Sequence, residues 1–264
     1  MAVLRDFIPP VVSRFLLKLG FAGNRFRYGY KGWEEAQAKC FGYSSEVITQ
    51  ALVSASRRVR DGEIAYERDG VEFDSIQYSW PLLAAILGSP RSTSKLRVLD
   101  WGGSLGSTYR QNKNLIEAAG VEMEWVVIEQ EHLVEIGTRE FSNTQLSFRS
   151  TIESIPVGYF DLVIFASSIC YLENPSKILE QVKSLMPRAI AFDRTPIVRK
   201  GPELIGMQTV GRRIYRASYP IRIFSIGWIE DTLSPEYRKV SEWVCDLQPD
   251  PHSISKGWFF LNSL

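Results

Sequence analysis

One short segment of the chain has the residue types and spacing of a nucleotide-binding loop. Residues 96–99 form an apolar run that ends in an acid and is followed by glycines and then by a helical pattern. The acid is Asp100, and the glycines are Gly102, Gly103 and Gly106. A buried strand, a tight loop and a helix N-terminus in this order bring backbone N–H groups close to a nucleotide-like ligand, and glycines permit the close approach because they lack a Cβ atom. The alternative is a glycine-rich turn that binds no ligand.

Two further apolar runs end in polar side chains. Glu129 ends the second run, 23 residues after Gly106, where an acid accepts hydrogen bonds from ribose hydroxyls in nucleotide-binding α/β folds. A solvated glutamate at a strand end is the alternative. Ser167 and Ser168 follow the third run, residues 160–165. We therefore expect polar groups from three strands at one edge of a sheet.

At these residues the chain resembles the class I S-adenosylmethionine-dependent methyltransferases. The first motif of that family reads acid-x-Gly-x-Gly-x-Gly, and this chain has Asp100, Gly102, Ser104 and Gly106 in its place, with Gly103 added beside the serine. The pattern differs from the Gly-x-Gly-x-x-Gly loop of NAD(P) dehydrogenases. The resemblance covers residues 96–264 and implies S-adenosylmethionine as the cofactor. It implies these cofactor-binding residues: Asp100, Gly102, Gly103, Gly106, Glu129, Ser167 and Ser168.

A narrower resemblance extends over nearly the whole chain. The residues that carry it are 26–30, 32–36, 42–43, 100–103 and 193–196. They are similar to a family of bacterial methyltransferases associated with surface-polysaccharide biosynthesis. The resemblance implies O-methylation of a sugar or sugar conjugate. A small metabolite or a lipid is the alternative acceptor, and a catalytically silent cofactor-binding partner protein is the alternative function.

Methyl transfer to a hydroxyl needs an aligned nucleophile and benefits from a base that takes its proton. Asp193 ends the predicted fifth strand at the ligand edge, and His252 lies in the loop between the last two predicted strands, which opens at the same edge. We expect one of them to be the general base. A base from the N-terminal region, or no base at all, is the alternative. Without a catalytic role, Asp193 would pair with Arg194 or cap a helix, and His252 would be an exposed loop residue.

Residues 194–222 are strongly basic and follow the fifth predicted strand. They contain seven lysines and arginines, and Glu203 is the one acid among them. Arginines suit phosphate or carboxylate recognition through paired N–H groups. We assign acceptor binding to Arg194, Arg212, Arg216 and Tyr171, and expect an anionic glycan, a nucleotide sugar or a lipid-linked sugar phosphate. A solvated basic loop or a subunit contact is the alternative.

The composition limits the remaining functions. The chain has 264 residues, of which 45% are hydrophobic, and a net charge of +1, which gives no electrostatic basis for a nucleic-acid partner. Three scattered cysteines and two histidines, with no Cys-x-x-Cys, predict no disulfide framework and no metal site. A reducing, cytoplasmic setting is therefore expected.

The first 20 residues predict an amphipathic helix over 11–19 rather than a signal peptide, because Pro9 and Pro10 interrupt the apolar segment. We expect this helix to pack on its own domain or on a second subunit, which leaves a homodimer open. Contact with a membrane interface is the alternative.

The elements that must position these residues alternate between strands and helices from residue 95 onward. Strands are predicted at 96–100, 123–129, 145–149, 160–165, 188–193, 238–244 and 257–261. Helices are predicted at 107–119, 131–139, 175–185 and 227–233. The pattern predicts an α/β fold with a Rossmann-like, doubly wound, seven-stranded sheet whose last strand is antiparallel. Residues 95–264 would form this methyltransferase domain, and residues 1–94 a mainly helical cap over its opening, with helices at 33–40, 44–59 and 78–87.

Overall fold

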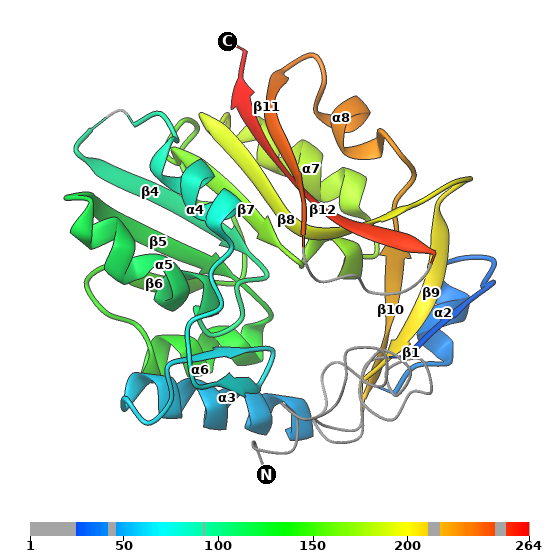
Figure 1. Ribbon diagram of the computed structural model, residues 1–264, viewed down its shortest axis with the longest axis horizontal. Helices are drawn as coiled ribbons and strands as arrows, with labels where there is room; N and C mark the ends of the chain where they lie inside the picture. Colours follow the sequence, from blue (N-terminus) through cyan, green and yellow to red (C-terminus); the bar gives the residue numbers. More distant parts are fainter. Residues whose placement is uncertain (1–24, 42–45, 92, 211–216, 246–251, 264) are drawn as a thin grey trace, which may run out of the picture.

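The computed structural model describes residues 25–41, 46–91, 93–210, 217–245 and 252–263. Its centre is a seven-stranded sheet in the order β11-β12-β8-β7-β4-β5-β6 (Figure 1). The strands are β4 (Lys95–Trp101), β5 (Glu122–Ile128), β6 (Leu146–Arg149), β7 (Leu162–Ala166), β8 (Ala189–Val198), β11 (Tyr237–Val244) and β12 (Ser253–Asn262). β12 is antiparallel to both of its neighbours, whereas β4 to β8 pair in parallel. The predicted doubly wound sheet with an antiparallel last strand is confirmed.

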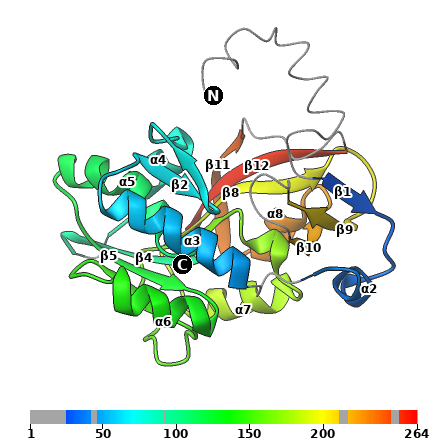
Figure 2. The same ribbon diagram turned by 90° about the horizontal axis from the view of Figure 1, so that it is seen from below.

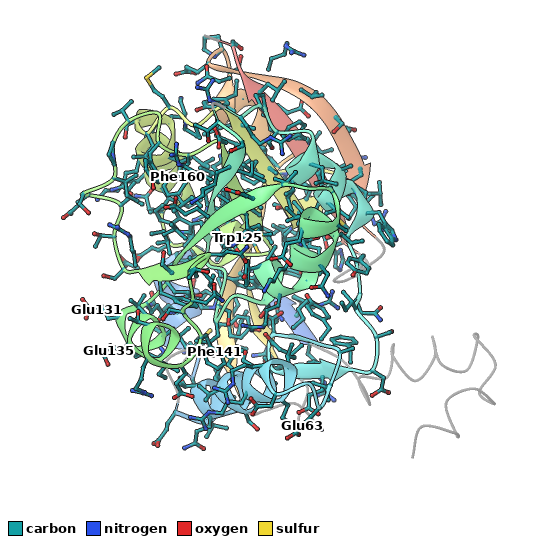
Figure 3. All side chains as sticks on the ribbon, turned by 90° about the vertical axis from the view of Figure 1, so that its left-hand side faces the viewer. Glu63, Trp125, Glu131, Glu135, Phe141 and Phe160 are labelled. Atoms are coloured by element: carbon teal, nitrogen blue, oxygen red, sulfur yellow. The ribbon has the colours of Figure 1, made fainter. Side chains whose placement is uncertain are left out.

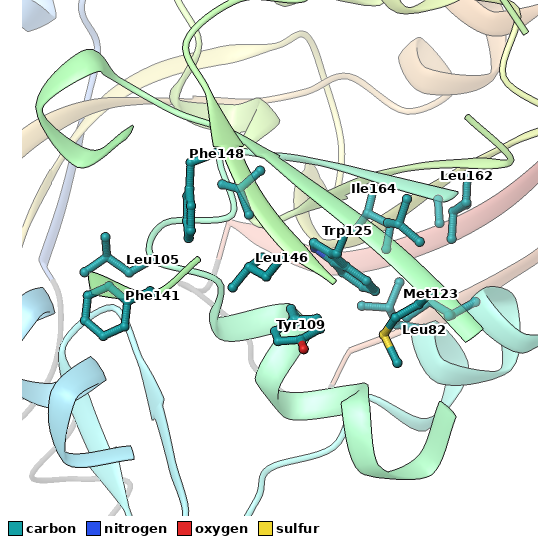
Figure 4. Close-up of a cluster of buried hydrophobic side chains, with 14 of the residues drawn as sticks. Leu82, Leu105, Tyr109, Met123, Trp125, Phe141, Leu146, Phe148, Leu162 and Ile164 are labelled. Carbon is teal, nitrogen blue, oxygen red and sulfur yellow. The ribbon is translucent and has the colours of Figure 1, made fainter. Parts of the chain in front are cut away.

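Helices cover both faces of this sheet, and each face buries its own apolar cluster. The first cluster receives side chains from α4 (Trp80–Leu87), α5 (Ser107–Ala118) and α6 (Glu131–Glu140). The second receives them from α7 (Pro175–Ser184) and α8 (Trp228–Leu233). Side chains alternate between the faces along each strand, so in β5 Trp125 belongs to the first cluster and Val126 to the second (Figure 4).

Large apolar side chains are buried inside the molecule, and charged side chains are exposed at its surface. Trp125 and Phe160 are almost completely buried within it, whereas Glu63, Glu131 and Glu135 are exposed at its periphery (Figure 3). No helix in the described ranges is long and apolar enough to cross a membrane. The helix predicted over residues 11–19 lies outside the described residues.

The N-terminal region contains the predicted helices and a hairpin. The helices are α2 (Trp33–Ala38), α3 (Glu46–Arg60) and α4, and the hairpin is formed by β2 (Tyr66–Arg68) and β3 (Val71–Phe73). Ile48 and Leu52 of α3 are buried in the first apolar cluster, so this helix is part of the packed fold. Figure 2 shows α3 lying across the molecule beside α6.

A second sheet, which the sequence did not reveal, joins the N-terminal region to the basic segment after β8. Its strands are β1 (Arg25–Tyr28), β9 (Leu204–Thr209) and β10 (Ser218–Ile223), and β9 pairs antiparallel with both of the others. No strand was predicted within 194–222, so β9 and β10 are additions to the predicted fold, and the described part of the N-terminal region contains three short strands beside its helices. β1 and β9 are about 180 residues apart in the chain, so no local pattern connects them.

The fifth strand of the prediction continues beyond its expected end. Asp193 does not end β8, which runs on to Val198. Asp193 does mark the end of the parallel pairing, because it is opposite Ala166, the last residue of β7. The next residue, Arg194, has a left-handed φ of 53°, and the β8–β12 register shifts opposite it between Lys256 and Trp258. Arg194 at this irregularity lines the cavity described below.

Candidate active site

A cavity of about 860 Å³ opens at the carboxyl edge of the parallel strands. Its floor is formed by Trp101 at the end of β4 and the segment 102–104 after it, together with the ends of β5 and β7. The β2–β3 hairpin and α3 line one side, and β9 and β10 line the other. Figure 1 shows these two groups of elements on opposite sides of the strand ends. The volume is at the upper end of the range for small-molecule sites.

The glycines after β4 are required first by contacts within the protein. Gly102 has a φ of 70°, and a Cβ atom there would lie 2.5 Å from the Cβ of Ser168. A Cβ atom on Gly103 would lie 2.5 Å from Oδ2 of Asp100. Gly106, with a φ of 92°, precedes α5. The loop is therefore in close contact with Asp100 and Ser168, two of the predicted site residues, and its backbone lines the cavity.

Asp100 supports this loop from inside the protein. Its side chain is completely buried, and its Oδ2 accepts a hydrogen bond of 3.2 Å from Nε1 of Trp125. Burial raises the pKa of Asp100 to about 7, because the charged form loses its hydration. Asp100 is not among the described residues that line the cavity.

Ser104 stands where the family motif has a glycine, and it adopts the conformation that a glycine would favour. Its φ is 53°, and its Oγ atom is buried without a hydrogen-bond partner among the described residues, although Ser104 lines the cavity. Glu129 lines the cavity directly after β5, and its Oε2 accepts a hydrogen bond of 2.8 Å from Gln130 N. Burial raises the pKa of Glu129. The two residues thus lie in the wall of the same cavity.

The two serines after β7 both line the cavity. Ser168 donates a hydrogen bond from Oγ to the carbonyl of Trp101, which fixes the glycine loop to the end of β7. Ser167 has a φ of 66°, and its N–H donates to the carbonyl of Asp193 over 2.8 Å. Tyr171, from the 3₁₀ turn η2 (Ile169–Tyr171), also lines the cavity and donates from Oη to Oε1 of Gln208 over 2.9 Å.

Asp193 is completely buried and accepts hydrogen bonds from several donors. Its Oδ1 accepts from Ser79 Oγ at 3.1 Å and from Trp243 Nε1 at 2.9 Å, and its Oδ2 accepts from Arg194 Nη1 at 2.6 Å. Arg194 lines the cavity, while Asp193 is not among its described lining residues. The Nε atom of Arg194 is buried without a hydrogen-bond partner in the described part of the chain. Asp193 thus holds the cation that faces the cavity.

The remaining predicted residues lie at the edge of the site or outside the description. His252 is exposed at the start of β12, with its ring 5.9 Å from that of Tyr28, and it is not among the described residues of the cavity wall. Arg212 and Arg216 lie outside the described residues. Within the described ranges, no group of His, Cys, Asp and Glu is placed to hold a metal ion.

Sequence reasoning missed the part of the wall that comes from the β2–β3 hairpin. Tyr66, Arg68, Asp69 and Phe73 of this hairpin all line the cavity. The Asp-Gly pair at 69–70 indicates a turn, but no local signal places that turn over the ends of distant strands.

Comparisons with known proteins define the fold. No protein-family model and no curated protein matches the chain. The [4+2]-cyclase SpnF is 12% identical over 82% of this chain and 93% of its own, with a TM-score of 0.52. The N-methyltransferase NodS from Bradyrhizobium japonicum WM9, in complex with S-adenosyl-L-homocysteine, is 17% identical over 70% and 85%, with a TM-score of 0.46. The N-terminal domain of EvdMO1, with S-adenosyl-L-homocysteine and D-fucose, is 13% identical over 84% and 100%, with a TM-score of 0.46.

At these identities the comparisons show the fold alone. The sheet order and the antiparallel β12 are those of the Rossmann-like methyltransferase fold. In such open α/β sheets, ligands bind outside the carboxyl ends of the strands. The cavity lies at that edge.

Proposed function

We propose that the protein is an S-adenosylmethionine-dependent methyltransferase. The observation that carries the proposal is one continuous cavity that spans the glycine loop, Glu129 and Arg194. The residues present fit the cofactor: the backbone of the glycine loop and the carboxylate of Glu129 line the same cavity, and we assign Glu129 to the ribose hydroxyls. The cofactor would supply a methyl group on a sulfonium centre, so the protein mainly has to align the acceptor and exclude water.

The acceptor we propose is the hydroxyl of a sugar or sugar conjugate, as in surface-polysaccharide biosynthesis. Aromatic side chains line the cavity from both of its sides, and such rings suit the apolar faces of sugars; they are Tyr66, Phe73, Tyr171 and Tyr219. Arg194 and Arg68 add two cations. The Arg194 guanidinium in the cavity wall suits a phosphate or carboxylate group, which favours an anionic acceptor.

Titration calorimetry with S-adenosylmethionine, S-adenosylhomocysteine and NAD tests the cofactor. We expect the first two to bind and NAD not to bind. Glu129→Gln weakens a charge-assisted contact of about 1.5–3 kcal/mol, so it should raise the Kd for S-adenosylmethionine about tenfold to hundredfold. Glu131→Gln is the matched control, because Glu131 is exposed at the start of α6 and should leave the Kd unchanged. Tight NAD binding, or no binding of S-adenosylmethionine, would refute the proposal.

A methyl-transfer screen tests the acceptor. It compares sugar phosphates, nucleotide sugars and neutral sugars with hydroxylated metabolites and lipid-linked sugars, and detects methylated product by mass spectrometry. We expect turnover with anionic sugars, and Arg194→Gln should raise their KM more than that of a neutral sugar. Equal effects on charged and neutral acceptors would remove the argument for an anionic acceptor.

A further inference from the structure

The cavity contains a carboxylate to which no role has been given. Asp69 and Glu129 are the carboxylates among the described lining residues, and no histidine is among them. Glu129 lies beside the glycine loop, at the position proposed for the ribose. Asp193 is saturated by hydrogen bonds behind Arg194. Asp69 comes from the β2–β3 hairpin, which lines one side of the cavity.

The backbone holds Asp69 in a defined place. Asp69 and Gly70 are the two turn residues between β2 and β3, with φ values of 54° and 76°, and Arg68 pairs with Val71 to close the hairpin. Positive φ at both positions is characteristic of a type I′ turn, for which Asp-Gly and Asn-Gly are the preferred sequences. The turn is therefore a rigid support for the Asp69 side chain.

A buried ion pair fixes this hairpin to the helix that follows the glycine loop. Glu67, which is 1% exposed, accepts hydrogen bonds from Gly70 N at 3.4 Å and from the hydroxyl of Ser107, the first residue of α5. Its Oε1 also lies 3.3 Å from Nη2 of Arg110. Arg110 in turn donates from Nη1 to the carbonyl of Leu105 over 2.7 Å. The turn that carries Asp69 thus keeps a constant position relative to the glycine loop.

The Asp69 carboxylate interacts electrostatically with Glu129 after β5 and with Arg194 in β8. Burial is the main cause of the raised pKa of Glu129, and the Asp69 carboxylate adds to it. Burial disfavours the charged form of Arg194, but Asp193, and after it Tyr66 and Asp69, keep the pKa of Arg194 above its ordinary value. These effects accord with the place of Asp69 in the wall of the same cavity as Glu129 and Arg194.

We propose that Asp69 is the general base that takes the proton from the acceptor hydroxyl. The inference rests on the proposed methyltransferase function. As the acceptor oxygen attacks, its new bond to the methyl carbon forms while the carbon–sulfur bond breaks, and that bond's electron pair remains on sulfur. The hydroxyl proton moves to a carboxylate oxygen of Asp69 and is later released to water.

The variant Asp69→Asn tests this role in the full chain. Asn-Gly is also a preferred type I′ sequence, so the hairpin should be retained. We expect a Kd for S-adenosylmethionine within about twofold of the unmodified protein, and a kcat about 10²–10⁴-fold lower with the best hydroxyl acceptor of the screen, as loss of a general base implies. The acid limb of the pH–rate profile should disappear. Asp74→Asn is the matched control, because Asp74 is exposed one residue after β3 and should leave all three measurements unchanged.

Several outcomes would overturn the inference. A large rise in the Kd with an unchanged kcat would make Asp69 a cofactor ligand, and a kcat within threefold of normal would leave it without a role in proton transfer. Loss of the acid limb in Asp193→Asn or His252→Ala, but not in Asp69→Asn, would assign the base to one of the residues predicted first. If S-adenosylmethionine binds but no hydroxyl acceptor is methylated, the base is excluded while the cofactor assignment stands. Absence of S-adenosylmethionine binding is a different result, because it refutes the proposed function itself.

Discussion

Replacing Glu67 with glutamine tests the buried ion pair that holds the β2–β3 hairpin on α5. The carboxylate is 1% exposed and the Arg110 side chain is 14% exposed, so neither charge is well hydrated. Burial lowers the pKa of Arg110, and the nearby Glu67 acts in the opposite direction. Glu67→Gln preserves the shape of the side chain but leaves the Arg110 cation without its buried counter-charge.

The expected loss of stability is large. Removing one partner of a buried ion pair costs about 3–5 kcal/mol, because the other charge remains desolvated. At about 2 °C per kcal/mol for a chain of this length, the Tm should fall by roughly 6–10 °C. Glu72→Gln is a matched control, because Glu72 is directly opposite Glu67 in the hairpin and pairs with Arg58 at the surface. Such an exposed pair contributes about 0–1 kcal/mol, so the Tm should change by about 2 °C at most.

Differential scanning calorimetry at pH 7 measures both changes, and a double variant isolates their cause. In Glu67→Gln combined with Arg110→Met no unpaired charge remains buried, so the loss should be smaller than the sum of the two single losses. Equal Tm values for Glu67→Gln and Glu72→Gln would refute the argument. So would strict additivity in the double variant, because it would show that the two side chains do not interact.

Three further measurements test the floor of the site and the thiols. The pKa of Asp100 is about 7 in the folded chain and 3.8 ordinarily. Relative to Asp100→Asn, the unmodified protein should therefore lose on the order of 2–3 kcal/mol of stability from pH 5 to pH 8, as measured by urea unfolding. A difference that stays constant with pH would contradict the raised pKa. Gly102→Ala should destabilise the protein by about 1–3 kcal/mol more than Gly120→Ala. Both glycines have positive φ, but only a Cβ at Gly102 would clash with Ser168. Equal losses of stability would show that the loop can move aside. Burial raises the pKa of all three thiols, and Cys40 is the least buried of them. One thiol should therefore react faster with Ellman's reagent than the other two, and Cys40→Ser should remove this fast reaction.

Most of the central sheet could be predicted because its strands are short apolar runs with clear ends. The end of β8 was misplaced for a local reason. Pro196 lacks an N–H, so the sequence around it, residues 194–196, has the composition of a strand terminus. In the fold, these residues continue in register with β12, which accommodates the irregularity through its own shift at Lys256. Pairing with a strand some 60 residues later in the chain overrides the local pattern.

The two halves of the site differ in how far the sequence reveals them. The half that we propose for the cofactor consists of loops that directly follow strands, so the place of Gly102, Glu129 and Ser168 at the cavity could be predicted from the sequence. The acceptor half is assembled from the hairpin at 66–73 and from β9 and β10, whose relation to the sheet depends on tertiary packing. Its residues have no shared motif in the sequence.

The roles of the aspartates depend on how many donors surround each carboxylate. Asp193 is at the edge where a base was expected, but its oxygens accept hydrogen bonds from Ser79, Trp243 and Arg194, and it is completely buried. Because these donors occupy its oxygens and it is not among the described residues that line the cavity, its role is to hold Arg194 in place. Asp69 lies on a turn that faces the cavity, where an acceptor hydroxyl can reach it. The same residue type therefore supports a cation at one position and, in our proposal, accepts a proton at the other.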